Sequence, residues 1–242
     1  MHGPLVARFG AWSLEPPRAG TLGLARVEID NAGAARWGDD VLASYHWLDE
    51  LGNALVWDGI RTPLPRVVEP GAHVEIELRV RAPIPPGPYR FAIDLVAEHR
   101  AWFAELGGDP TGGDVDVLPR IEAMSLAEVA DVHVPPACAP APDWEKRVLA
   151  AHAEGYAVVA GSIDAPRRLR KALAAWAPGT GRDPAFAQPL LCPSILGGVE
   201  AERIADVEGL PAFCPPPDEP WLYDGSLVVR LTARPRSGRR PG

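Results

Sequence analysis

Short segments of alternating apolar and polar residues, separated by turns, run from residue 20 to residue 118. In the clearest segment, residues 73–80, every second side chain is apolar and those between are charged, so one face of a strand meets the core and the other meets water. Glycine and proline stand between the segments, as at 69–71 and 84–87. This pattern predicts a sandwich or barrel with strands at 22–30, 41–49, 54–58, 73–80, 89–97, 102–105 and 115–118.

The pattern changes after residue 118. Residues 119–143 include the proline-rich stretch VPPACAPAPDW, and we interpret this segment as a linker. Apolar side chains then recur at helical spacing over 144–154, and the apolar run GYAVVAGSI at 155–163 suits a buried strand. A helix followed by a strand is the simplest interpretation.

The rest of the chain is rich in proline and glycine. We expect a second helix over 166–176, a weak helix over 199–207 and a closing strand over 226–231. Together with the helix and strand before them, these elements predict a small, loop-rich α/β domain over 144–231. Arginines crowd the last residues, and 232–242 are expected to form a basic disordered tail.

Composition narrows the class of protein. The net charge is −8, and residues 1–118 carry 17 Asp and Glu against 10 Arg and Lys, while the remainder carries 15 against 14. An acidic first half repels phosphate backbones, so no nucleic-acid partner is expected. The chain shows neither a signal peptide nor 18 consecutive apolar residues, which predicts a cytoplasmic protein with no membrane span. Its three cysteines lack metal-binding spacing, so no metal and no cofactor are expected.

Aromatic and acidic residues form a distinctive ordered series in the first half: RW at 36–37, YHW at 45–47, VWDG at 56–59, RTPLP at 61–65, PGPY at 86–89, DLVAE at 94–98 and WF at 102–103. This series resembles an accessory module that is appended to bacterial surface-polysaccharide glycosyltransferases and methyltransferases. The resemblance covers about residues 20–118. It implies an immunoglobulin-like β-sandwich that acts near cell-envelope glycan synthesis, and by itself it implies no reaction.

The fold class expected for the whole chain is therefore mainly β. An N-terminal immunoglobulin-like β-sandwich, residues 1–118, is followed by the small, loop-rich α/β domain.

Five residues of the aromatic series are candidates for a glycan site. Aromatic rings stack on the apolar faces of sugars, and carboxylates or guanidinium groups hydrogen-bond the hydroxyls. By this chemistry the site would comprise Tyr45, Trp47, Trp57, Asp58 and Arg61. The alternative is that the rings fill the core of the sandwich, because each ring buries a large area and needs at most one polar partner.

Other polar residues of the first half give weaker indications of chemistry. Strand alternation points Tyr45 and Trp47 to one face and His46 to the other, and no nucleophile motif accompanies His46, so a structural histidine is favoured. Asp94 and Glu98 share a face of one strand. At about 3.3 Å per residue they are roughly 13 Å apart, too far for a glycosidase pair.

The C-terminal half offers three further candidate ligand-binding residues. Arg182 lies in the glycine-containing segment WAPGTGRDP, which could cradle a phosphate or simply end a helix. Glu219 and Asp224 flank aromatic residues in DEPWLYDG, a mixture that glycan and nucleotide-sugar sites share. No DxD metal motif accompanies them.

Three functions are consistent with these features. We favour a non-catalytic binding or accessory protein, linked to bacterial cell-surface glycan biosynthesis, whose partner is a glycan or nucleotide sugar. The first alternative is a small glycosyltransferase-like or other enzyme that acts through the C-terminal domain. The second is a structural protein whose sandwich mediates contacts with a protein partner or a homo-oligomer. No catalytic residue is assigned, because neither half assembles a nucleophile, a base and oxyanion donors.

Overall fold

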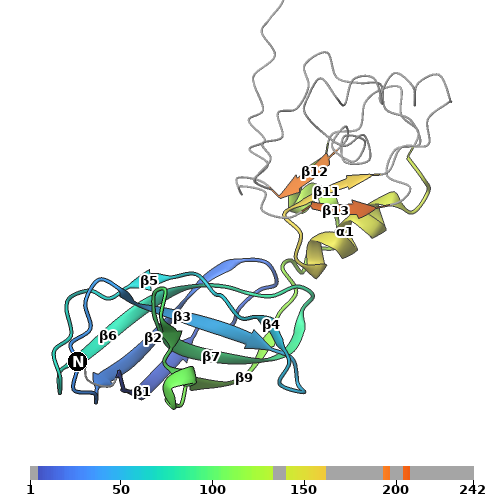
Figure 1. Ribbon diagram of the computed structural model, residues 1–242. Helices are drawn as coiled ribbons and strands as arrows, with labels where there is room; N and C mark the ends of the chain where they lie inside the picture. Colours follow the sequence, from blue (N-terminus) through green and yellow to red (C-terminus); the bar gives the residue numbers. More distant parts are fainter. Residues whose placement is uncertain (1–4, 133–139, 162–192, 197–203, 208–242) are drawn as a thin grey trace, which may run out of the picture. The chain divides into compact units, whose positions relative to one another are not determined.

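A computed structural model describes residues 5–132, 140–161, 193–196 and 204–207 (Figure 1). The chain divides into two compact units, Met1–Arg120 and Ile121–Gly242. The described part is mainly β, as the sequence predicts, and the first unit is built from two antiparallel sheets.

A three-stranded sheet forms one side of the first unit. Its strands, in spatial order, are β1 (Ala7–Leu14), β2 (Leu22–Asn31) and β6 (His73–Arg81). The alternation predicted for β6 is confirmed, because its apolar side chains are buried and its charged ones are exposed. Strand β1 was not predicted, and a bulge between Phe9 and Trp12 explains why, since it shifts the register and breaks the period of two.

The second sheet has six strands, and every pairing in it is antiparallel. Its centre is the long pair β3 (Val41–Leu48) and β7 (Gly87–Ala97). The short strands are β4 (Ala54–Val56), β5 (Thr62–Pro63), β8 (Ala101–Trp102) and β9 (Thr111–Val117). The strand predicted for 102–105 is only partly present, because β8 ends at Trp102 and the 3-10 helix η1 (Ala104–Leu106) follows.

One hydrophobic core lies between the two sheets, and aromatic rings of β3 and β7 dominate its centre. The ring of Phe91 packs against Trp47, with centroids 4.8 Å apart, and against Tyr45, at 5.8 Å. Trp47 and Tyr45 also bind the backbone of Arg81 on the opposite sheet. Trp47 Nε1 donates to the carbonyl oxygen at 2.9 Å, and Tyr45 Oη accepts from the amide nitrogen at 2.9 Å. These rings therefore join the sheets by hydrogen bonds as well as by packing.

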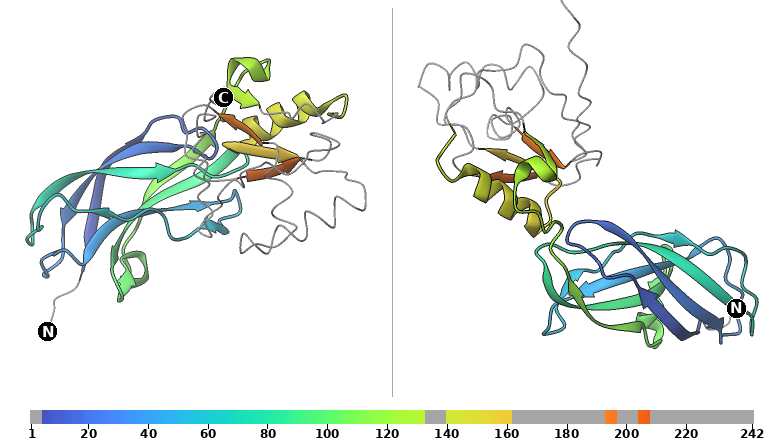
Figure 2. Two further views of the ribbon diagram at one scale, coloured as in Figure 1. Left: turned by 90° about the horizontal axis from the view of Figure 1, so that it is seen from above. Right: turned by 180° about the vertical axis from the view of Figure 1, so that it is seen from behind.

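In the second unit the described elements are η2 (Leu126–Glu128), β10 (Ala130–Val132), α1 (Trp144–Glu154), β11 (Val158–Gly161), β12 (Pro193–Leu196) and β13 (Ile204–Val207). The strands form one sheet in the order β10-β12-β11-β13, with β11 and β13 parallel and the other pairs antiparallel. The predicted helix over 144–154 is confirmed. It lies beside the sheet in Figure 2, and its Val148 packs with Val159 of β11.

Two expectations for this half need correction. Strand β10 lies inside the segment 119–143 that was interpreted as a linker, and it pairs with β12, which is more than sixty residues away in sequence. Strand β13 occupies the end of the weak helix expected over 199–207, because parallel pairing with β11 stabilises an extended backbone there. A short apolar run cannot reveal such a distant partner.

Other expectations fall outside the described residues: the helix over 166–176, the strand over 226–231 and the tail over 232–242. Within the described ranges, no helix has the length and apolar character needed to cross a membrane.

Candidate functional site

The outward side of the six-stranded sheet carries buried polar side chains. Tyr45 and Trp47 of β3 point into the core, so Ser44 and His46 point to the opposite face, where Asp94 of β7 also lies. An outward face of an antiparallel sheet usually meets water, yet Ser44, His46 and Asp94 are all buried. The segment after β4 and the strand β8 cover them, as their contacts with His46 show.

His46 anchors the segment after β4 to the sheet. Its Nδ1 lies within hydrogen-bonding distance of the Trp57 carbonyl oxygen, and because a carbonyl can only accept, Nδ1 carries the proton. On the other side of the ring, Nε2 is 3.7 Å from Asp94 Oδ2 and has no hydrogen-bond partner among the described residues. The His46 ring also contacts Trp102, with centroids 4.4 Å apart. The imidazole therefore packs against the indoles of both Trp57 and Trp102.

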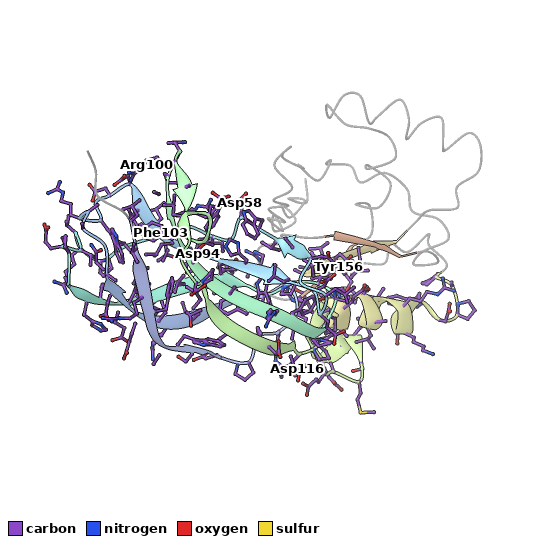
Figure 3. The ribbon with its side chains drawn as sticks, turned by 60° about the horizontal axis from the view of Figure 1, so that its bottom comes forward. Asp58, Asp94, Arg100, Phe103, Asp116 and Tyr156 are labelled. Atoms are coloured by element: carbon purple, nitrogen blue, oxygen red, sulfur yellow. The ribbon has the colours of Figure 1, made fainter. Side chains whose placement is uncertain are left out.

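Asp94 holds the segment after β7 in the same way. Its Oδ1 accepts from the Leu95 amide at 2.8 Å, and its Oδ2 accepts from the Ala104 amide at 3.2 Å, at the start of η1. Figure 3 labels Asp94 together with Asp58, which belongs to the segment after β4. Both covering segments are thus tied to the sheet by a buried polar residue.

Arg61 is the hub of the polar groups nearer the surface. Its Nε donates to Glu98 Oε1 at 2.8 Å and its Nη2 to Asp58 Oδ1 at 2.8 Å. Its Nη1 donates to Ser44 Oγ at 3.2 Å and to the Gly59 carbonyl oxygen at 3.1 Å. Burial lowers the pKa of the guanidinium, but the hydrogen bonds to Asp58 and Glu98 outweigh it, so its pKa lies above the usual value.

The indole of Trp57 is presented to solvent from this base. One of its faces stacks on the His46 imidazole, with centroids 4.1 Å apart and planes inclined by 21°, while the residue as a whole is 42% exposed. The side chains of Asp58 and Glu98 are 70% and 32% exposed. We call Trp57, Asp58, Arg61 and Glu98 the Trp57 surface.

Gly59 allows the segment after β4 to lie close to the backbone of β3. Its amide donates to the Tyr45 carbonyl oxygen at 3.1 Å, and a Cβ built on Gly59 would lie 2.5 Å from that same oxygen. Any larger residue would have to lift the segment from β3. The glycine of VWDG is therefore fixed by a contact between backbones.

The structure separates the eight candidate residues into three groups. It brings Trp57, Asp58 and Arg61 together at the surface. It places Tyr45 and Trp47 in the core, as the alternative interpretation holds, so neither side chain lies open to a ligand. Arg182, Glu219 and Asp224 lie outside the described residues.

Sequence reasoning missed the residues that support Trp57. His46 was treated as an ordinary structural histidine, and Glu98 was considered only as a partner of Asp94. The available signal was the alternation in YHW and DLVAE, which places His46, Asp94 and Glu98 on the face away from the core. No local pattern indicated that Trp57 and Trp102 would cover that face.

The second unit contains a serine and histidine in contact. His152 Nδ1 lies 2.8 Å from the Tyr156 carbonyl oxygen, so it carries the proton, and Nε2 accepts from Ser194 Oγ at 3.0 Å. A nucleophile and its base share this geometry. Both residues are 0% exposed, however, so this pair is a hydrogen bond within the core. In the part of the chain that the structure describes, no group of three or more His, Cys, Asp or Glu could hold a metal ion.

No protein-family model matches the chain, and no curated protein matches it. Solved structures similar to parts of it include the C-terminal domain of wzt, at 10% identity and a TM-score of 0.34, covering 50% of this chain and 77% of that one. A β-glucosidase from Listeria innocua in complex with glucose shares 14% identity at a TM-score of 0.27, over 48% of this chain and 16% of the enzyme. A family 123 glycoside hydrolase from Clostridium perfringens shares 10% identity at a TM-score of 0.29, over 72% of this chain and 32% of the enzyme.

This chain thus spans only a small part of the length of either glycosidase. Every one of these TM-scores is below 0.5, so none of these similarities indicates a function for this chain.

Proposed function

We propose that this chain is a non-catalytic binding or accessory protein of bacterial cell-surface glycan biosynthesis, located in the cytoplasm. Its first unit is an immunoglobulin-like β-sandwich that binds carbohydrate through the Trp57 surface, and its second unit is a small α/β domain. One observation carries the proposal: an exposed indole is stacked on a buried imidazole and flanked by hydrogen-bonding side chains.

The stacked indole suits a sugar because of its rigidity. A pyranose ring presents an apolar face of C–H groups, and a flat aromatic ring matches that face. A freely rotating tryptophan would lose conformational entropy on binding, whereas Trp57 is already held by His46 on one face and by the hydrogen bond to its carbonyl group. The exposed part of the indole is therefore held in place before a ligand binds.

The fold proposal has two supports. Two antiparallel sheets enclose one core, which is the architecture of an immunoglobulin-like sandwich. The ordered series of aromatic and acidic motifs resembles the accessory module of surface-polysaccharide proteins, and the residues of the Trp57 surface belong to those motifs.

Asp94, which lies beneath this surface, and Glu98, which belongs to it, each hold neighbouring groups in place, and this favours binding over catalysis. Asp94 accepts hydrogen bonds from two backbone amides, and Glu98 is held by Arg61. A general acid or base needs a mobile proton within reach of a substrate. Asp94 is buried beneath the covering segments and does not meet this condition.

A glycan array probed with the full-length chain tests this proposal. We expect a restricted set of glycans to bind, and Trp57→Ala to weaken their binding more than about tenfold, because it removes the stacking platform. Leu51→Ala is the matched control, since Leu51 is an exposed apolar residue of the same unit outside the Trp57 surface. Array binding that is absent, or that survives Trp57→Ala unchanged, would contradict the proposal.

A further inference from the structure

The Trp57 surface offers a ligand more hydrogen-bond acceptors than donors. We infer, on the basis of the proposed function, that it selects sugars that donate hydrogen bonds and carry no negative charge. These are neutral or amino sugars. Uronic acids and the pyrophosphate of a nucleotide sugar are excluded.

Most of the hydrogen-bond donors of Arg61 are used by the protein itself. A guanidinium has five N–H groups. Four of them are used by Glu98, Asp58, Ser44 and Gly59. The Arg61 guanidinium, which would ordinarily bind an anionic ligand, therefore has one N–H group left. It cannot bind a carboxylate or phosphate through two parallel hydrogen bonds.

Asp58 and Glu98 each keep one carboxylate oxygen available as an acceptor. The hydrogen bonds to Arg61 use Asp58 Oδ1 and Glu98 Oε1, which leaves Asp58 Oδ2 and Glu98 Oε2 without a hydrogen bond to any described residue. Asp58 is largely exposed and Glu98 is half-buried. Ionised carboxylates only accept, so the matching ligand groups are hydroxyls and ammonium groups.

The Trp57 surface is also negatively charged. Asp58 and Glu98 against Arg61 leave one net negative charge on the Trp57 surface, and Asp94 lies buried on the same side of the sheet. Residues 1–118 as a whole carry 17 acidic against 10 basic side chains. An anionic sugar would therefore approach a like charge, whereas an amino sugar would be attracted to the carboxylates and to the face of the indole.

Collisional quenching tests this polarity without any glycan. The signal of Trp57 is the difference between the full-length chain and Trp57→Phe. The quenchers are caesium and iodide at constant ionic strength, and each quenching constant is divided by the constant that the same ion gives with free N-acetyltryptophanamide. We expect caesium to quench Trp57 at least about twofold more effectively than iodide, because the surface concentrates cations. Asp58→Asn combined with Glu98→Gln should abolish or reverse this preference. Asp116→Asn, which removes an exposed carboxylate on β9, should leave it unchanged.

Matched sugars test the same inference on binding. For each glycan that binds on the array, we compare the neutral form with the form oxidised to a uronic acid at C6. We expect the oxidised form to bind at least about tenfold more weakly, and UDP-glucose to give no thermal shift. Asp58→Asn should weaken binding of the neutral form, whereas Asp116→Asn should not.

The outcomes separate the two proposals. Stronger binding of oxidised glycans, or equal quenching by iodide and caesium, overturns the selectivity inferred here even if glycans bind. If no glycan binds but caesium remains the better quencher, the carbohydrate-binding function is wrong, while the negative charge of the Trp57 surface is confirmed. Binding of an oligolysine peptide in place of any sugar would overturn the ligand class, because the same acceptors would then serve a protein partner.

Discussion

The imidazole of His46 lies face to face with the indole of Trp57, and its Nδ1 donates to the carbonyl oxygen of the same tryptophan. One buried side chain on β3 therefore fixes both the ring and the backbone of the exposed residue. Asp94 of β7 faces the other edge of the imidazole, with its Oδ2 3.7 Å from Nε2.

This relationship predicts the effect of His46→Phe. The phenyl ring preserves most of the stacking, but the Trp57 carbonyl group loses its donor and Asp94 loses its polar neighbour. We expect the free energy of unfolding to fall by about 1–3 kcal/mol, measured by urea denaturation. His73→Ala is the control, since His73 is exposed, and it should change stability by less than about 0.5 kcal/mol. Equal effects of the two changes would contradict the role of His46.

The two tryptophans Trp47 and Trp57 should respond differently to truncation. Trp47→Ala removes a fully buried ring and its hydrogen bond to Arg81, so we expect a loss of about 3–5 kcal/mol in the free energy of unfolding. Trp57→Ala should cost less than about 1.5 kcal/mol, because the residue is 42% exposed, while it weakens glycan binding more than about tenfold. Denaturation curves and array binding of both variants check this separation.

Gly59→Ala tests the close approach of the segment after β4. The new Cβ would meet the Tyr45 carbonyl oxygen, so the segment must move and we expect a loss of about 1–3 kcal/mol, with weaker glycan binding. Gly23→Ala is the matched control. Its Cβ would meet nothing within 4 Å, and we expect a change within about 1 kcal/mol. A Gly59→Ala variant as stable as Gly23→Ala would show that the contact is unimportant.

The turn between β3 and β4 predicts a pH dependence of stability. Hydrogen bonds from the Asn53 side chain, and from the backbone amides of Asn53 and Leu51, hold the pKa of Asp49 below its usual value. Between the folded and unfolded pKa values the unfolded state binds more protons, so this contribution is present above about pH 4 and is lost as the pH falls through the folded pKa. In Asp49→Asn we expect a shallower decline of the thermal midpoint below about pH 4. An unchanged acid limb would contradict this assignment.

Ser194→Ala distinguishes a core hydrogen bond from a catalytic pair. The variant removes the hydroxyl that donates to His152 Nε2, and we expect the second unit to lose about 1–3 kcal/mol, measured by hydrogen exchange of α1. The native chain should not react with a fluorophosphonate probe, because Ser194 is fully buried. Covalent labelling of Ser194 would instead support the enzyme alternative.

Local periodicity was sufficient for much of the first unit. The alternation in β6, and the assignment of Tyr45 and Trp47 to one face of β3 and His46 to the other, follow from the period of two and agree with the structure. Strand β1 escaped the same reasoning because a bulge breaks its period, and β10 and β13 escaped it because their partners are distant in sequence.

Only some of the residues of the Trp57 surface could be predicted from the sequence. VWDG and RTPLP indicated Trp57, Asp58 and Arg61, but they also indicated Tyr45 and Trp47, since an aromatic residue has the same chemistry in a core and in a binding site. Glu98 could not be assigned because its partner Arg61 is 37 residues away. Burial and pairing decide these roles.

Local patterns were enough to predict most strands of the first unit, the mainly β character, the acidic first half and the two faces of the alternating strands. Those properties depend on neighbouring residues and on the fixed geometry of an extended chain. Long-range packing, by contrast, makes one face of the sheet the core and buries His46 and Asp94 on the other face. It also brings Asp58 and Glu98 to the positions where Arg61 donates to them. These depend on how distant segments fold over the sheet, which local pattern does not specify.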